Sequence, residues 1–119
     1  MRVLVTGASG FVGSRVVECM MLTGMAKPLA AIRSWSRAAR VARFGADVVL
    51  CDIESPEQVD RAVSQVDAIV HLAKTDDRES IVGGTRNLLE SAVKHSVKRF
   101  VYLSTAEVYG PNVSGYIKV

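Results

Sequence analysis

The sequence predicts an α/β fold built on a doubly wound parallel sheet with strand order 3-2-1-4-5. Short runs rich in β-branched residues alternate along the chain with segments of helical periodicity, and this alternation requires parallel strands joined by right-handed crossovers. The runs are almost continuously apolar, as expected of strands that helices cover on both faces. The predicted strands are residues 2–6, 29–33, 47–51, 68–72 and 99–103, and the predicted sheet is truncated after the fifth.

The first two predicted helices flank the second strand. The helix at 11–24 has apolar residues at helical spacing and stops at Gly24, because glycine favours the position just past a helix end. The helix at 36–44 is short, rich in arginine and ended by Gly45. The apolar stripe of the first helix consists of Phe11, Val12, Val16, Val17, Met20 and Met21.

The other two predicted helices begin after the third and fourth strands. Ser55 is expected to be an N-cap, Pro56 fits the first turn, and Gln58 is placed to close a capping box. The last helix is predicted at 79–95. Its buried side is expected to carry Leu88, Leu89, Ala92 and Val93.

Composition is that of one ordinary globular domain: 119 residues, 49% hydrophobic and 23% charged. No apolar run approaches the roughly 18 residues of a membrane span, so no membrane partner is expected. Cys19 and Cys51 fall in different predicted elements and offer neither a disulfide framework nor metal-ligand spacing. We expect both to be reduced core residues, with no metal site and a cytoplasmic setting.

The net charge of +3 is concentrated in a segment without acidic residues that contains Arg33, Arg37, Arg40 and Arg43. A nucleic-acid surface is one interpretation of such a cluster. The small overall charge argues against it, and no nucleic-acid partner is expected.

A glycine-rich turn joins the first strand to the first helix, with the pattern Gly-x-x-Gly-x-x-Gly at Gly7, Gly10 and Gly13. Gly7 would permit the tight turn, Gly10 would let the backbone approach a pyrophosphate, and Gly13 would let the helix pack closely. Free N–H groups and the dipole at the helix start favour an anion. The alternative is a purely structural turn. The predicted phosphate-binding residues are Gly7, Ser9, Gly10, Phe11, Val12 and Gly13.

The sequence TGASGFVG at 6–13 resembles the extended short-chain dehydrogenase/reductase family, which includes the NAD-dependent epimerases and dehydratases. The similarity continues through DI at 52–53, HLA at 71–73, GTRNLLE at 84–90 and STAEVYG at 104–110, about nine-tenths of the chain. It implies a Rossmann-type fold, a nicotinamide dinucleotide, and only the N-terminal part of such an enzyme. Residues 1–110 are then the dinucleotide-binding domain, and 111–119 a tail that starts a substrate-binding half.

Arg33 lies about twenty residues beyond Gly13, where NAD-specific folds carry an acid that binds the adenosine ribose. A guanidinium can instead pair with a 2′-phosphate through two hydrogen bonds. Ser34 and Arg37 could add contacts. These residues favour NADP as the cofactor, with NAD possible; the alternative is that Arg33 is a solvated strand end.

The family resemblance implies further cofactor contacts beyond the third and fourth strands. Asp52 would accept a hydrogen bond from the adenine amine and Ile53 would pack on the ring, although Asp52 could simply cap a turn. Leu72 and Ala73 would border the cofactor by their backbone. Lys74 could reach a phosphate or ribose, or stay solvated.

The two histidines carry no catalytic prediction. His71 ends the fourth strand and is expected to be a hydrogen-bonded structural residue. His95 lies on the polar side of a predicted helix and is expected at the surface.

By the same resemblance, the catalytic candidates follow the fifth strand. Thr105 would hydrogen-bond a substrate hydroxyl or carbonyl, and Glu107 matches an acid–base position of some dehydratases. Ala106 stands where those dehydratases place an aspartate, which disfavours a dehydratase. The Tyr-x-x-x-Lys pair is missing, since Tyr116 and Lys118 are two apart and point away from each other.

Two functions remain open from the sequence. The first is the NAD(P)-binding part of an epimerase, dehydratase or reductase that acts by hydride transfer, with a small-molecule substrate that could be a nucleotide sugar. The second is a non-catalytic NADP-binding regulatory module, favoured by the missing pair and by Ile81, which replaces a family asparagine. Self-association to a homo-oligomer is expected through the apolar edge of the fifth strand.

Overall fold

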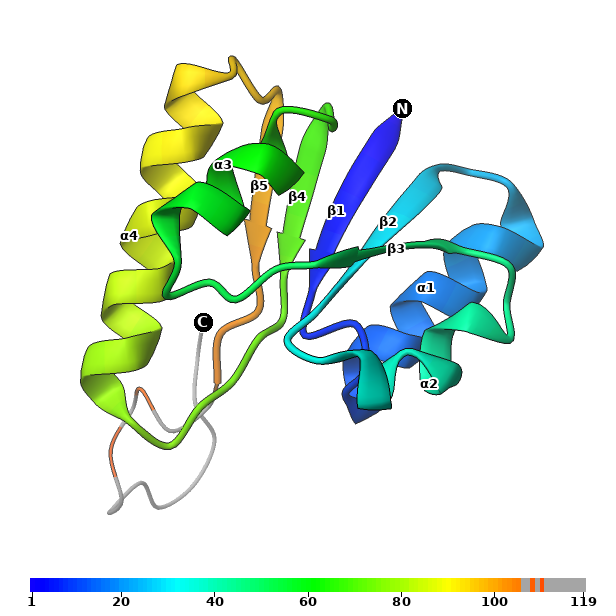
Figure 1. Ribbon diagram of the computed structural model, residues 1–119, viewed down its shortest axis with the longest axis horizontal. Helices are drawn as coiled ribbons and strands as arrows, with labels where there is room; N and C mark the ends of the chain where they lie inside the picture. The colour runs from blue at the N-terminus through cyan, green and yellow to red at the C-terminus, as the bar shows by residue number, and fades with distance from the viewer. Residues whose placement is uncertain (106–107, 109, 111–119) are drawn as a thin grey trace.

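The computed structural model describes residues 1–105, 108 and 110, and within them the chain forms one five-stranded sheet of order β3-β2-β1-β4-β5 (Figure 1). Every neighbouring pair of strands is parallel. The predicted fold class and strand order are therefore confirmed. The strands are β1 (Arg2–Thr6), β2 (Lys27–Ile32), β3 (Asp47–Leu50), β4 (Ala68–His71) and β5 (Arg99–Tyr102).

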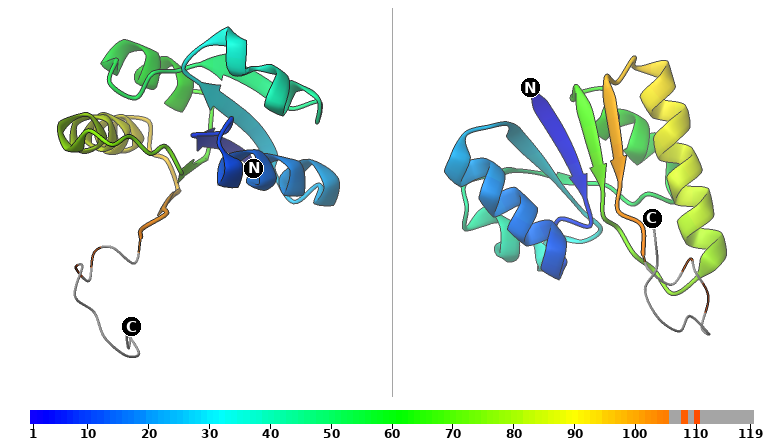
Figure 2. Two further views of the ribbon diagram at one scale, coloured as in Figure 1. Left: turned by 90° about the horizontal axis from the view of Figure 1, so that it is seen from below. Right: turned by 180° about the vertical axis from the view of Figure 1, so that it is seen from behind.

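Helices cover both faces of the sheet, as Figure 2 shows: α1 and α2 lie on one side, and α3 and α4 on the other. This is the layering that a doubly wound sheet requires. The helical elements are α1 (Phe11–Thr23), the 3₁₀ turn η1 (Trp35–Arg37), α2 (Ala39–Ala42), α3 (Pro56–Val63) and α4 (Arg78–Lys94). Among the described residues, no helix has both the length and the apolarity to cross a membrane.

Side chains of the central strands alternate between two cores, because successive residues of a strand point to opposite faces. In β1, Leu4 joins the core beneath α3 and α4, whereas Val3 and Val5 join the core beneath α1 and α2. All three are nearly or fully buried. The almost unbroken apolar sequence of β1 thus serves both layers.

The arginine-rich helix predicted at 36–44 is instead two short pieces, η1 and α2. Val41 is the only buried residue of these two pieces, so only the short turn of α2 packs against the sheet. Ser34 and Ser36 bond each other through their hydroxyls at 2.9 Å at the start of η1, and serines in such positions compete with helix formation.

The apolar stripe predicted for α1 is only partly correct. Gly13 and Val17 are its buried residues, while the Phe11 side chain is 86% exposed and Val12 and Met21 are also exposed. Phe11 and Val12 belong to the first turn, which lies beside a cavity rather than on the sheet.

The capping box predicted for α3 is wrong. Ser55 is the N-cap residue and Pro56 occupies the first turn, as expected, but the Ser55 side chain makes no cap hydrogen bond, and its hydroxyl donates to Glu57 Oε2 at 3.2 Å. Gln58 Oε1 accepts from the backbone N–H of Asp52 at 3.0 Å. The glutamine therefore stabilises the preceding turn instead of the helix start.

The buried side of α4 differs from the prediction by two residues. Leu88 and Ala92 are buried, but Leu89 is 46% and Val93 82% exposed. Adjacent residues on a helix point about 100° apart, so a side that buries Leu88 and Ala92 turns the following residues outward. The positions buried together with them are Gly84 and Ser91.

The cysteines also differ from one another. Cys51 is buried as expected, but Cys19 is exposed on α1, so the prediction of two core thiols is wrong for Cys19. Both thiols are free.

Candidate functional site

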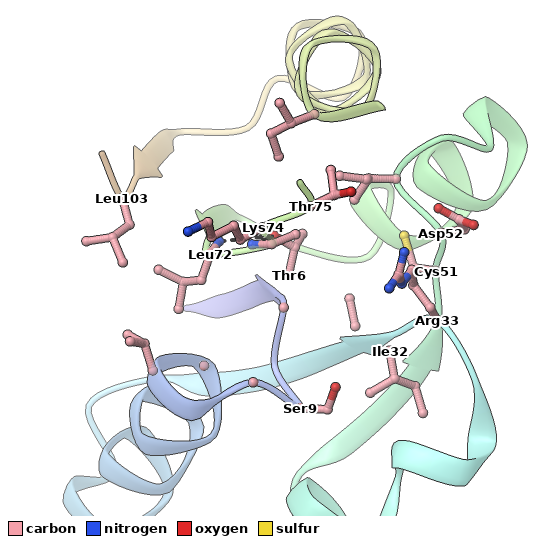
Figure 3. A pocket seen from close by; sticks show the side chains of 18 of the residues that line it. Thr6, Ser9, Ile32, Arg33, Cys51, Asp52, Leu72, Lys74, Thr75 and Leu103 are labelled. Carbon is pink, nitrogen blue, oxygen red and sulfur yellow. Dashed lines mark hydrogen bonds between the residues drawn. The ribbon is translucent and has the colours of Figure 1, made fainter. Parts of the chain in front are cut away.

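A cavity of about 620 Å³ lies at the carboxyl ends of the strands, where β1 and β4 feed crossovers on opposite faces of the sheet. This is the position at which open α/β sheets bind ligands. Figure 3 looks into it, with Ser9 from the glycine-rich turn, Arg33 beyond β2, Asp52 beyond β3 and Lys74 beyond β4 around the opening.

The structure brings together every sequence-predicted cofactor residue except Ser34 around this cavity. Ser34 is half-buried, bonds Ser36, and does not line it. The residues that do line it are Gly7, Ser9, Gly10, Phe11, Val12, Gly13, Arg33, Arg37, Asp52, Ile53, Leu72, Ala73 and Lys74.

The glycine-rich turn needs at least two of its three glycines for steric reasons. Gly7 has φ +67, and a Cβ there would lie 2.7 Å from the backbone N of Ala73 and from the carbonyl carbon of Leu72. A Cβ on Gly13 would lie 2.1 Å from the carbonyl oxygen of Gly7. The first turn of α1 therefore packs directly on the loop, which real Cβ atoms would prevent.

The start of α1 is chemically suited to an anion. Its N-cap, Gly10, has no side chain to occupy the free N–H groups, and the first turn contains no acidic residue. The first amides of a helix have no partner within the helix. Together with the helix dipole, the amides of Phe11, Val12 and Gly13 can therefore receive a phosphate.

Positive charge borders the same opening. Arg33 follows β2, Arg37 ends η1, and both line the cavity with exposed side chains. Arg40 approaches from outside the lining: its Nη1 donates to the carbonyl oxygen of Ser9 at 3.2 Å. The arginine-rich segment is thus tied to the glycine-rich turn.

The β3 end of the cavity combines a carboxylate with apolar surface. Asp52 Oδ1 accepts from the backbone N–H of Glu54 at 3.1 Å, so Asp52 does cap a turn, using one of its two carboxylate oxygens. Ile53 is buried against α4, where a Cβ on Gly84 would lie 2.5 Å from its side chain. Burial raises the pKa of the Cys51 thiol to about 11, and the neighbouring Asp52 adds to this.

His71 is a buried, hydrogen-bonded residue, as expected. Its ring nitrogens contact the hydroxyls of Thr6 at 2.6 Å and Thr85 at 3.0 Å. Burial lowers its pKa from 6.5 to about 4, so the ring is neutral near pH 7.

The other histidine is not simply at the surface. His95 is half-buried at the end of α4, and its Nε2 lies 2.8 Å from Asp60 Oδ1. Hydrogen bonds from Lys94 and His95 hold the pKa of Asp60 below its usual value. These residues tie α3 to α4, away from the cavity.

The catalytic candidates are only partly covered by the structure. Thr105 is exposed and lines the cavity together with Ser104, just beyond β5. Glu107 lies outside the described residues, as does the proposed tail at 111–119. Their predicted roles therefore stay predictions.

Sequence reasoning did not assign several cavity residues, although Thr6 and Ser104 stand within the sequence motifs it used. They lie at or just past strand ends, or in the first turn of α4, where a consistent count from each predicted strand would have found most of them. They are Thr6, Ala31, Ile32, Cys51, Glu54, Thr75, Ser80, Ile81, Tyr102, Leu103 and Ser104.

Within the part of the chain that the structure describes, no group of histidine, cysteine, aspartate and glutamate side chains is arranged to hold a metal ion. The side chains around the cavity instead combine arginines, a lysine, hydroxyls and apolar groups with free helix amides, together with the two carboxylates of Asp52 and Glu54. This set matches a phosphate-containing organic ligand better than a metal.

The strand order and the glycine-rich turn after β1 define a Rossmann-type nucleotide-binding domain. The chain belongs to the 3-beta hydroxysteroid dehydrogenase/isomerase family, whose model matches residues 4–118. The resemblance to the extended short-chain dehydrogenases, epimerases and dehydratases is thereby confirmed.

Individual relatives agree with this assignment. The 3 beta-hydroxysteroid dehydrogenase/Delta 5-->4-isomerase of Mycobacterium tuberculosis is 34% identical, over 96% of this chain and 35% of that protein. A UDP-glucose 4-epimerase from Thermotoga maritima, solved with UDP-glucose, superposes with a TM-score of 0.84 at 28% identity, covering 98% of this chain and 42% of that one. A dTDP-glucose 4,6-dehydratase variant from Streptomyces venezuelae, solved with NAD, superposes with a TM-score of 0.81 at 32% identity. This match covers 97% of this chain and 42% of that one. The chain thus spans about two-fifths of these proteins' length.

Proposed function

We propose that this chain binds a nicotinamide dinucleotide, prefers NADP, and is the cofactor-binding part of an enzyme that acts by hydride transfer on a hydroxyl or carbonyl group. The observation that carries the proposal is the cavity itself, in which a glycine-rich turn, a helix start without acids, and two arginines face one space. A pyrophosphate fits the first two features, because the free amides and the dipole at the start of α1 favour an anion and the first turn has no acidic residue to repel it. Family membership favours an enzyme over a purely regulatory module.

The preference for NADP is supported by Arg33 and Arg37. A guanidinium can form paired, charge-assisted hydrogen bonds with a 2′-phosphate. Asp52 and Glu54 also line the cavity, but they follow β3 rather than β2. Asp52 and Ile53 are proposed to contact the adenine, and Leu72, Ala73 and Lys74 the remainder of the dinucleotide.

In the proposed reaction, the nicotinamide supplies the hydride donor or acceptor. Thr105 is proposed to hold the substrate oxygen by a hydrogen bond while charge develops on it, and Glu107 to assist proton transfer. The proposed substrate class is a nucleotide sugar, supported by the UDP-glucose and dTDP-glucose enzymes among the relatives. A cytoplasmic setting is part of the proposal, supported by the free thiols of Cys19 and Cys51.

The cofactor proposal is tested by calorimetric titration of the wild type, Arg33→Ala and Arg43→Ala with NADP and with NAD. Arg43 belongs to the same arginine cluster but does not line the cavity, and its guanidinium lies over the Phe44 ring. We expect Arg33→Ala to weaken NADP binding about tenfold to a hundredfold, the range for a charge-assisted hydrogen bond, and to leave NAD binding almost unchanged.

The control Arg43→Ala should change either affinity by less than about twofold, since an exposed charge outside contact distance is screened. Tighter binding of NAD than of NADP by the wild type would overturn the preference. Failure of both dinucleotides to bind would overturn the proposed function.

A further inference from the structure

A chain of hydrogen bonds passes behind the cavity and joins β1, β4 and α4. Thr6 Oγ1 lies 2.6 Å from His71 Nδ1, and His71 Nε2 lies 3.0 Å from Thr85 Oγ1. Thr85 Oγ1 donates to the carbonyl oxygen of Ile81 at 2.6 Å. His71 is completely buried, and so is its contact with Thr6, whereas the two contacts of Thr85 are partly buried.

The direction of the chain follows from counting protons. The carbonyl of Ile81 can only accept, and the hydroxyl of Thr85 has one proton, which it gives to that carbonyl. Thr85 Oγ1 must therefore accept from His71, which places the ring proton on Nε2. The unprotonated Nδ1 then accepts from the Thr6 hydroxyl.

The far end of the chain reaches the cavity wall. Thr6 Oγ1 accepts from the backbone N–H groups of Leu72 at 3.2 Å and Ala73 at 3.3 Å. Because its single proton is directed at His71, its oxygen can accept from both amides, and the Leu72 N–H is shared with the carbonyl oxygen of Thr6 at 3.3 Å. Leu72 and Ala73 line the cavity on one side, and Ile81 lines it from α4.

We infer that His71, held as the neutral Nε2–H tautomer by Thr6 and Thr85, is a positioning residue that fixes the wall at Leu72–Ala73 relative to the first turns of α4. The inference rests on the proposed function, because its consequence is the shape offered to a dinucleotide. The same wall lies 2.7 Å from where a Cβ on Gly7 would stand. A shift of the Leu72–Ala73 segment therefore changes its fit to the phosphate-binding turn as well.

The first test is the ¹⁵N spectrum of the ligand-free chain labelled at its histidines. The shifts and proton couplings of the ring nitrogens distinguish a protonated from an unprotonated nitrogen. At pH 7 we expect His71 to show a protonated Nε2 and an unprotonated Nδ1. A protonated Nδ1 would overturn the inference, whatever the chain binds.

The second test compares Thr85→Val, Thr85→Ser and Thr23→Val. Valine keeps the shape of threonine but leaves the His71 N–H without its acceptor, whereas serine retains the hydroxyl. Thr23 is a matched control, because its hydroxyl also donates to a carbonyl four residues earlier, that of Cys19 at 2.7 Å, with no histidine involved.

Thr85→Val should raise the dissociation constant for NADP about threefold to tenfold, the range for one neutral hydrogen bond, and should change the tautomer signature of His71. Thr85→Ser should keep the wild-type NADP affinity and the wild-type tautomer signature of His71, and Thr23→Val should alter neither. Should Thr85→Val fail to fold, the tautomer of His71 in the wild-type spectrum still decides the inference. Unchanged NADP affinity in a folded Thr85→Val would overturn it, whereas a wild type that binds no dinucleotide would overturn the proposed function instead.

Discussion

Replacing Gly13 by alanine tests whether the glycine-rich turn requires close backbone packing at this position. The added Cβ would lie 2.1 Å from the carbonyl oxygen of Gly7 and 2.8 Å from the Cα of Ala8. Both atoms are backbone, so neither can rotate aside as a flexible side chain would. Either the loop or the helix start must move by about 1.3 Å or more to reach ordinary contact, which begins near 3.4 Å.

The energetic consequence can be bounded from known overpacking effects. Inserting a methyl group into a closely packed site destabilises a protein by about 1–3 kcal/mol, and a clash with backbone atoms belongs at the upper end. We therefore expect Gly13→Ala to lose about 3 kcal/mol of unfolding free energy. A displaced loop that loses one amide–phosphate hydrogen bond would also weaken NADP binding about tenfold or more.

The control is Gly83→Ala. Gly83 lies inside α4, and a Cβ there meets nothing within 4 Å. Alanine should therefore stabilise the helix by up to about 1 kcal/mol and leave NADP affinity unchanged. Urea unfolding and NADP titration of both variants provide the comparison. Equal stability and equal affinity in Gly13→Ala and Gly83→Ala would refute the steric reasoning.

Three other predictions concern groups outside the glycine-rich turn. The pKa of His71 is about 4 in the folded chain, against 6.5 for an ordinary histidine, so acid protonates this residue in the unfolded chain first. The free energy of unfolding should therefore be at its maximum above about pH 6.5 and fall by about 3 kcal/mol toward pH 4. Urea unfolding at several pH values should show this slope, and His71→Gln should flatten it; an equal slope in the variant would contradict the assignment. In thiol labelling followed by mass spectrometry, the exposed Cys19 should react quickly, whereas the buried Cys51, whose pKa is raised to about 11, should react only when the chain unfolds. Equal labelling rates of the two thiols in the folded chain would contradict this prediction. The edge strand β5 exposes Val101, so light scattering should detect self-association that Val101→Lys reduces, whereas a monomeric wild type at high concentration would rule it out.

The fold could be predicted from the sequence because its strongest signals are local. Strand β1 has a continuous apolar centre at Val3, Leu4 and Val5, and the glycine pattern directly after the strand has few structural alternatives. Helix ends were accurate where a single residue type decides them, as at Gly24, which has φ +65. Each of these signals is contained within a few residues of sequence.

The details that failed depend on tertiary contacts. Gln58 has the right spacing for a capping box, but the turn before α3 offers the amide of Asp52 instead. The buried side of α4 was misjudged at Leu89 and Val93, because apolar residues fill two adjacent stripes and only packing selects one. Residue spacing alone could therefore predict neither the hydrogen-bond partner of Gln58 nor the buried side of α4.

The site could be predicted residue by residue only where a motif exists. Arg33 and Asp52 line the cavity as expected, because position along a parallel strand determines where its end lies. Ser34 is adjacent to Arg33 in sequence but turns to Ser36. The linkage of Thr6, His71 and Thr85 joins three elements, and no local pattern specifies which hydroxyls a histidine will meet.

The most direct test of the central claim is a backbone amide NMR titration of the chain with NADP. The account predicts that the largest shifts at saturation fall on the amides from Gly7 to Gly13, with a second group around Arg33. Saturable binding that leaves both groups unshifted, or no binding at millimolar NADP, would contradict it.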